Sequence, residues 1–116
     1  MKIAILVREE TLERCTASGC MNAFFNKIDS FARYADQDVE LVSFTHNGGE
    51  LDKKIAMLQT KGVDTIHLSS CMRSKDPNYV ALAQRLSQHF SVVGYTHGEE
   101  VGKSGAAIIL DKMNGN

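Results

Sequence analysis

Four short apolar runs constrain the fold of this chain most strongly. They are separated by stretches in which apolar residues have helical spacing or residue types typical of a helix start occur. Residues 3–7 form a continuous apolar run, which is typical of a strand that is covered on both faces. Further strands are predicted over 39–44, 63–69 and 91–95. Because strands that alternate with helices are joined by right-handed crossovers, the sequence predicts a parallel sheet with strand order 2-1-3-4.

The expected fold is an α/β three-layer sandwich, flavodoxin-like or Rossmann-like, with a mostly parallel sheet of four or five strands. The chain has 116 residues, of which 43% are hydrophobic and 23% charged, as in an ordinary globular domain. We therefore expect one domain over 1–116. Within it, 98–116 form either a tail or an additional strand over 106–110, and 114–116 are expected to fray.

Three helices are predicted between the strands. Apolar residues recur at i, i+3, i+4 and i+7 over 21–35, which predicts one amphipathic helix. A second helix is expected over 51–62 with Gly62 as its stop signal. Asp76 and Pro77 have the residue types of a helix cap and first helical position, so a third helix is expected to open there. Its buried stripe is predicted to consist of Tyr79, Ala83, Leu86 and Phe90.

Charge and hydropathy exclude two kinds of partner. The formal net charge is −1 and no run of Lys and Arg is present, so we expect no nucleic-acid partner. The apolar run over 3–7 is too short for a signal peptide or a membrane span, so we expect no membrane partner and a cytoplasmic location. In a reducing compartment, the three cysteines are expected to be thiols or ligands rather than disulfides.

Cysteines and histidines recur just after the predicted strands. Cys15 and Cys20 follow the first strand, His46 the second, Cys71 the third and His97 the fourth. The carboxyl ends of parallel strands meet at one edge of a sheet, where ligands of α/β proteins bind. The leading interpretation is therefore a cofactor or metal site at that edge. For each residue taken alone, the alternative is a buried thiol or a surface histidine.

Two of these neighbourhoods allow a narrower expectation. Cys20 lies near the start of the predicted helix over 21–35, where positive partial charge favours the thiolate that a nucleophile or a metal ligand requires. His67 lies inside the third strand, and we interpret it as a buried histidine with satisfied hydrogen bonds rather than a ligand. His89 is expected to complement a helix C-terminus.

Three segments resemble the CGGC-domain family, small proteins that are named for a central Cys-Gly-Gly-Cys and implied to bind metal. Residues 15–20 are similar to the first cysteine pair of the family, 66–72 to its third-strand motif, and Thr96-His97 to the pair that ends the domain. The resemblance runs from Met1 to about His97. It implies an α/β domain with a metal ion as partner.

The central motif of the family is altered in this chain, which reads Asn47-Gly48-Gly49-Glu50 in its place. Because three cysteines cannot supply four thiolates, an iron–sulfur cluster is not expected from a single chain. The resemblance instead implies a zinc site with three thiolates and one imidazole. Glu50 is either an oxygen ligand or part of a helix cap. The implied ligands are Cys15, Cys20, Cys71 and His97, with His46 as the alternative to His97.

Three functional hypotheses follow. The first is a small cytoplasmic domain that binds zinc through the residues named above. The second is a thiol-dependent redox or transfer enzyme, in which Cys20 is the nucleophile and Cys15 or Cys71 resolves an oxidised intermediate. The third is a domain that kept the family fold, lost its site, and acts as a binding or oligomerisation module, with a second copy of the chain as its partner.

Overall fold

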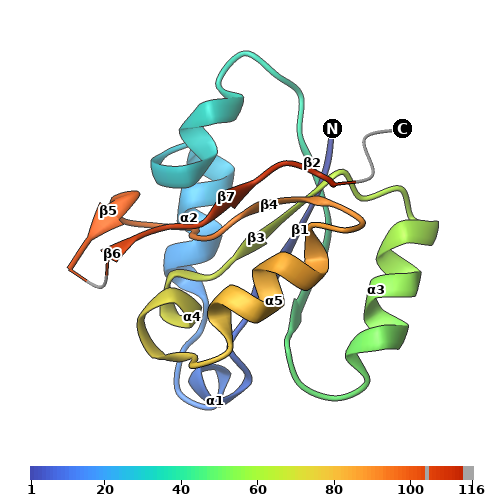
Figure 1. Cartoon of the computed structure of the whole chain (residues 1–116). Coiled ribbons are helices and arrows are strands. Elements are labelled where there is room, and N and C mark those ends of the chain that lie inside the picture. Colours follow the sequence, from blue (N-terminus) through green and yellow to red (C-terminus); the bar gives the residue numbers. More distant parts are fainter. Residues whose placement is uncertain (104, 114–116) are drawn as a thin grey trace.

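The computed structural model describes residues 1–103 and 105–113. Its main sheet has the strand order β2-β1-β3-β4-β7, which confirms the predicted order 2-1-3-4 and adds one edge strand (Figure 1). The first four strands along the chain are mutually parallel, whereas β7 is antiparallel to β4. The bounds of these strands are β1 Lys2–Val7, β2 Glu40–His46, β3 Thr65–Leu68, β4 Ser91–Val93 and β7 Ile109–Leu110.

Helices cover both faces of the sheet, so the fold is a three-layer α/β sandwich. The helix α2 and the 3-10 helix η1 lie on one face, and α3 and α5 lie on the other (Figure 1). The bounds are α1 Glu9–Leu12, α2 Ser18–Asn26, η1 Asp29–Tyr34, α3 Leu51–Thr60, α4 Ser70–Lys75 and α5 Tyr79–Leu86. A separate hairpin consists of β5 Val101–Gly102 and β6 Gly105–Ala106.

The central strand β1 supplies both hydrophobic cores, and this explains why its sequence is apolar without alternation. Ile3 and Ile5 pack against α2 and η1 on one face. Ala4 and Leu6 pack against α3 and α5 on the other face. Successive side chains of a strand point to opposite faces, so a strand between two helical layers must be apolar at every position.

The helix predicted over 21–35 is wrong as a single element. The helix α2 ends at Asn26, because Lys27 and Asp29 adopt left-handed backbone conformations with φ of 50° and 54°. A new 3-10 helix starts at Asp29, and its Ser30 donates its backbone N–H to the carbonyl oxygen of Thr96 at 3.3 Å. The apolar periodicity continues across this break, so the sequence pattern could not locate the break.

The third predicted helix starts later than expected, and a short helix that the sequence did not predict precedes it. The chain forms α4 before Asp76, and α5 starts only at Tyr79. Asp76 still shapes the junction, because its carboxylate accepts the backbone N–H of Asn78 at 2.8 Å. The predicted stripe is buried, since Tyr79, Ala83, Leu86 and Phe90 are at most 7% exposed.

The segment after the fourth strand closes one edge of the sheet. Of the predicted strand over 106–110, only Ile109–Leu110 pairs with β4. Ile108 is fixed from two sides: its carbonyl oxygen accepts the N–H of Gly94 at 2.7 Å, and its N–H donates to the hydroxyl of Tyr79 at 3.0 Å. Residues 114–116, which were expected to fray, lie outside the described residues.

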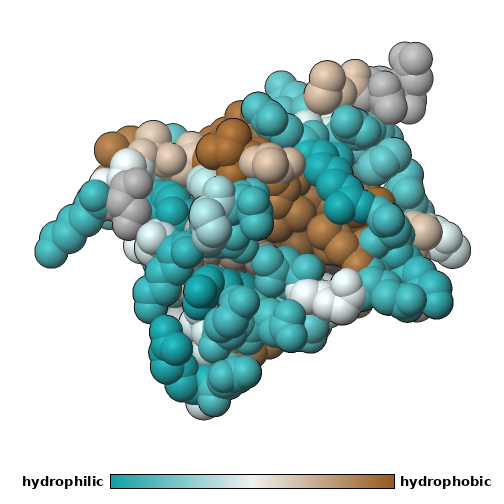
Figure 2. Space-filling model, turned by 60° about the horizontal axis from the view of Figure 1, so that its bottom comes forward, coloured by the Kyte–Doolittle hydropathy of each residue, from teal (hydrophilic) through white to brown (hydrophobic). Residues whose placement is uncertain are grey.

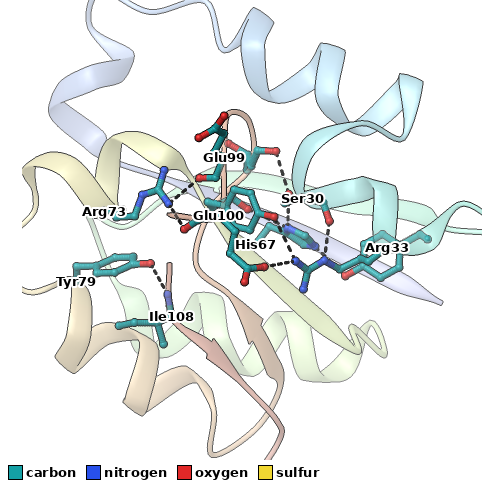
Figure 3. A network of polar contacts seen from close by, with 11 residues as sticks. Ser30, Arg33, His67, Arg73, Tyr79, Glu99, Glu100 and Ile108 are labelled. Carbon is teal, nitrogen blue, oxygen red and sulfur yellow. Dashed lines mark hydrogen bonds and ion pairs between the residues drawn. The ribbon is translucent and has the colours of Figure 1, made fainter. Parts of the chain in front are cut away.

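Two arginines hold the loop that leads into this segment. Arg73 donates to the carbonyl oxygens of Glu99 and Glu100 at 3.0 and 2.8 Å, and Arg33 forms an ion pair with the Glu100 carboxylate at 3.2 Å (Figure 3). Both guanidinium groups also lie within 6 Å of the Tyr95 ring. The loop is therefore packed on the end of β4 rather than free.

Among the described residues, no helix combines the length and the apolar character that crossing a membrane requires.

Candidate metal-binding site

A small pocket lies where the chain diverges from two neighbouring strands. After β1 the chain passes to the face covered by α2, and after β3 it passes through α4 to α5 on the opposite face. Such a switch point is where ligands bind in open α/β sheets. The pocket has a volume of about 50 Å³, and it is lined by Val7, Thr11, Leu12, Cys15, Ala17, Cys20, Ser69, Cys71 and His97.

All three cysteines and His97 thus border one pocket, although they come from segments far apart in the sequence. Cys15 is exposed, Cys71 is half-buried and Cys20 is only 6% exposed. A tight turn brings the first pair together, because Ala17 adopts a left-handed conformation with φ of 62° and donates its N–H to the Cys15 sulfur at 3.3 Å. Left-handed backbone is uncommon for a residue other than glycine, so packing must hold this turn.

The sulfur of Cys20 faces the end of β4. It lies 3.1 Å from the hydroxyl oxygen of Thr96, a residue with no exposed surface. The hydroxyl of Thr96 also accepts the backbone N–H of Ser70 at 3.4 Å. Thr96 therefore connects the helix that carries Cys20 with the helix that carries Cys71.

The sulfur of Cys71 has an equivalent partner in Ser69. Its distance to the Ser69 hydroxyl oxygen is 2.8 Å, and Ser69 is buried. Both residues lie at the start of α4, directly after β3. Two of the three sulfurs at the pocket therefore each contact one buried hydroxyl group.

His97 is fixed by its backbone and by its neighbour on α2. The hydroxyl of Ser70 donates to the carbonyl oxygen of His97 at 2.6 Å and accepts the N–H groups of Thr96 and His97 at 3.2 Å each. The imidazole lies over Gly19, where an added Cβ would be 3.0 Å from the ring. Gly19 therefore allows the ring to pack directly on the first turn of α2.

The electrostatics of Cys20 differ from the expectation based on its position near a helix start. Burial raises the pKa of the Cys20 thiol, because removal from water disfavours the charged thiolate. The hydrogen bond from Thr96 lowers this pKa, while negative charge on Cys71 and Cys15 raises it. The thiol form of Cys20 is therefore favoured when no cation is present.

The other candidates lie away from this pocket. His46 ends β2, and its Nδ1 accepts the N–H of Gly48 at 3.0 Å. Glu50 is exposed and pairs with Lys53 at 3.0 Å. The side chain of Asn47 does not cap α3 but accepts the N–H of Glu9 at 3.0 Å. The residues at the altered central motif therefore do not line the pocket with the cysteines.

His67 is a buried histidine with satisfied hydrogen bonds, as predicted. Its Nδ1 donates to the carbonyl oxygen of Tyr95 at 3.1 Å, and its Nε2 accepts from the hydroxyl of Tyr34 at 2.8 Å. The ring stacks on Phe31 with a centroid distance of 4.2 Å. Burial lowers the pKa of His67 to about 3, so this imidazole is neutral at physiological pH.

A wider recess on the same molecule has different chemistry. Figure 2 shows apolar residues between α5 and α3, framed by hydrophilic side chains. The recess there has a volume of about 280 Å³ and is lined by Asn47, Leu51, Asp76, Asn78, Ala81, Leu82 and Arg85. It contains no cysteine or histidine, so the smaller pocket is the better candidate for thiol or metal chemistry.

The donor set of the small pocket fits zinc. Three thiolates and one imidazole form one of the usual tetrahedral sets of structural zinc sites. Within residues 1–103 and 105–113, no three or more side chains of His, Cys, Asp and Glu are grouped as ligands of one ion. The residues that would hold the ion are those that line the pocket, namely Cys15, Cys20, Cys71 and His97, once their side chains close around it.

Three residues of this region were missed or undervalued in the sequence. Ser69 and Ser70 stood out only as part of the third-strand motif over 66–72, and Thr96 only as part of the pair that ends the family domain. The contacts of Ser70 with His97 and of Thr96 with Cys20 depend on how distant segments meet, whereas Ser69 contacts Cys71 two residues further along the chain. The one available signal was that each lies beside a candidate ligand in the sequence.

The fold and the pocket define a small α/β protein with a doubly wound sheet and a thiol-lined site at its switch point. The chain belongs to the CGGC-domain family, whose sequence pattern matches residues 2–97. The match covers β1 through β4 and all four residues of the candidate site, and it ends before the segment that carries β5, β6 and β7. No curated protein and no solved structure matches the chain.

Proposed function

We propose that this protein is a small metal-binding domain that holds zinc in the pocket at the switch point of its sheet. The proposed ligands are Cys15, Cys20, Cys71 and His97. The observation that carries the proposal is that these residues line one pocket of about 50 Å³. Membership of the CGGC-domain family supports it, because the family is suggestive of metal binding.

The size and the lining of the pocket favour an ion over an organic ligand. Pockets for small molecules and cofactors commonly enclose about 300 Å³ or more. A volume of about 50 Å³ suits a single ion. Thiolates select soft or borderline metals, and three cysteines are too few for a cluster that needs four thiolates. Zinc with three thiolates and the imidazole of His97 is therefore the proposed occupant.

A bound cation also resolves the electrostatic problem of Cys20. Burial raises the pKa of this thiol, so the thiolate is unfavourable without a compensating positive charge nearby. A metal ion supplies that charge, and its binding releases the thiol protons. The raised pKa removes the main support for Cys20 as a nucleophile with a low pKa, so we do not favour the thiol-enzyme hypothesis.

The proposed location is the cytoplasm, because free thiols persist in a reducing compartment. In the described part of the chain, Cys15, Cys20 and Cys71 are all free cysteines. Free thiols are also the form from which thiolate ligands are generated. The proposed partner is the metal ion itself.

The proposal is tested by elemental analysis of protein that has been purified without added metal. We expect about one zinc per chain in the wild type, as in a structural site with four protein ligands. The zinc should be lost in the Cys20→Ala, Cys71→Ala double variant and reduced in His97→Ala. His46→Ala is the matched control, because His46 lies outside the pocket, and it should retain the metal. Folded wild-type protein that contains no metal and takes up none from added zinc would overturn the proposal.

A further inference from the structure

Two of the thiols at the pocket each form a hydrogen bond with a buried hydroxyl group. The Cys71 sulfur lies 2.8 Å from the Ser69 oxygen, and the Cys20 sulfur lies 3.1 Å from the Thr96 oxygen. Ser69 and Thr96 are 1% and 0% exposed. Buried hydroxyl groups are rarely left without partners, and a thiol is a partner of each of these two.

Ser69 stands where a serine normally caps a helix. It is the N-cap residue of α4, a position at which a serine hydroxyl usually accepts a backbone N–H of the first turn. Its side chain makes no such cap hydrogen bond. The hydroxyl instead contacts Cys71, two residues further along. The usual stabilising role of this serine is thus replaced by a contact with a candidate ligand.

Thr96 takes over part of the capping role and is oriented by it. Its hydroxyl oxygen accepts the N–H of Ser70, the first residue of α4, at 3.4 Å. Because the oxygen acts as acceptor there, its proton is available for the Cys20 sulfur. The backbone of Thr96 is held as well, since its N–H donates to the Ser70 hydroxyl at 3.2 Å.

We propose that Ser69 and Thr96 are positioning residues of the metal site, whose hydroxyl groups donate hydrogen bonds to the Cys71 and Cys20 sulfurs when these act as ligands. This inference rests on the proposed function. A deprotonated sulfur can only accept, so each hydroxyl becomes the donor in the ligated state. Partners of this kind orient ligands and tune the bound metal, and their loss costs about 10- to 100-fold in metal affinity.

A donated hydrogen bond also has a spectroscopic consequence. It withdraws electron density from the sulfur and stabilises the lone pair that is excited in a sulfur-to-metal charge-transfer transition. Removal of the donor should therefore move this transition of a bound Co²⁺ ion to longer wavelength. A purely structural contribution of the hydroxyl groups to folding would not produce this shift.

The test is a titration of the metal-free full-length protein with Co²⁺, followed by absorption spectroscopy. We compare the wild type with Thr96→Val, Ser69→Ala and the conservative Thr96→Ser. Thr96→Val and Ser69→Ala should each bind Co²⁺ about 10- to 100-fold more weakly and shift the charge-transfer band to longer wavelength. Thr96→Ser keeps the hydroxyl and should restore both affinity and spectrum. Circular dichroism checks that each variant is folded.

Ser87→Ala is the matched control, because Ser87 is also a buried serine but bonds to the carbonyl oxygen of Gln84, away from the pocket. It should leave the spectrum unchanged. Unaltered Co²⁺ affinity and spectrum in both Thr96→Val and Ser69→Ala would overturn the positioning role and leave the metal site intact. Absence of any Co²⁺ binding by the wild type would overturn the proposed function and this inference together. If Thr96→Val fails to fold, Ser69→Ala decides the question.

Discussion

At the scale of single residues, the neutral imidazole of His67 links the stability of the protein to pH. Its pKa is lowered by burial from 6.5 to about 3 in the folded state. The unfolded state therefore binds a proton between these two pH values and the folded state does not. The contribution of neutral His67 to the free energy of unfolding is fully present above pH 6.5. It is lost as the pH falls towards 3, by about 1.4 kcal/mol per pH unit.

We predict that this pH dependence is absent in His67→Gln. The free energy of unfolding should be measured by urea titration between pH 7 and pH 4 for the wild type and the variant. At pH 7 the variant should be less stable by about 1–3 kcal/mol, because the Tyr34 hydroxyl or the Tyr95 carbonyl loses its partner. His89→Gln, which alters a histidine that is only partly buried, serves as the control. Parallel pH profiles of the wild type and His67→Gln would contradict the assignment.

At the scale of secondary structure, the hydroxyl of Tyr79 joins α5, β4 and the segment before β7. It donates to the carbonyl oxygen of Gly94 at 2.7 Å and accepts the N–H of Ile108 at 3.0 Å. Gly94 is required at this junction, because an added Cβ would lie 2.0 Å from the Tyr79 oxygen and 2.7 Å from the Ile108 oxygen. The edge strand β7 pairs with β4 through two residues, so its position also depends on the hydrogen bonds of the Tyr79 hydroxyl.

We predict that Tyr79→Phe loosens β7 while β1 and β3 stay intact. The loss of two hydrogen bonds should reduce the free energy of unfolding by about 1–3 kcal/mol. Amide hydrogen exchange should accelerate at Ile108 and Leu110, since the segment opens more often. Tyr95→Phe is the comparison variant, because the Tyr95 hydroxyl bonds to Arg33 instead. Equal protection of β7 in wild type and Tyr79→Phe would show that strand pairing alone holds the edge.

At the scale of the whole molecule, the pocket joins segments that span most of the chain. Cys15 and Cys20 follow β1, Cys71 follows β3, and His97 follows β4. A ligand held by all of them binds the folded state and not the unfolded chain. It therefore raises the stability of the entire domain rather than of one element.

We predict that zinc raises the free energy of unfolding by about 2.7 kcal/mol when free zinc is 100 times the dissociation constant. The measurement is thermal or urea unfolding of metal-free protein with and without zinc. The Cys20→Ala, Cys71→Ala variant should show no increase, whereas His46→Ala should respond like the wild type. A zinc response of equal size in the double cysteine variant would place the ion elsewhere.

Much of the architecture could be predicted because it depends on local pattern. The apolar run of β1 predicted a strand buried on both faces, and the alternation of strands with helices predicted the order of the parallel strands. Convergence of the carboxyl ends of these strands predicted that Cys15, Cys20, His46, Cys71 and His97 would lie near one another. The structure places four of them on one pocket, whereas His46 does not line it.

Other features could not be predicted, since they depend on contacts between distant segments. Apolar spacing runs through Lys27 and Asp29, where left-handed backbone separates α2 from η1 and Ser30 then forms a hydrogen bond with Thr96. The position of Cys20 near a helix start suggested a favoured thiolate, but its burial raises its pKa.

The sequence by itself determined the sheet and the edge at which the thiols gather, because strand faces and chain direction follow from short-range periodicity. Only the tertiary structure decided which residues surround those thiols. Thr96 contacts Cys20 from the end of another segment, and the altered motif that begins at Asn47 does not line the pocket. The physical reason is that hydrogen bonds and burial depend on positions in space, which local pattern along the chain does not specify.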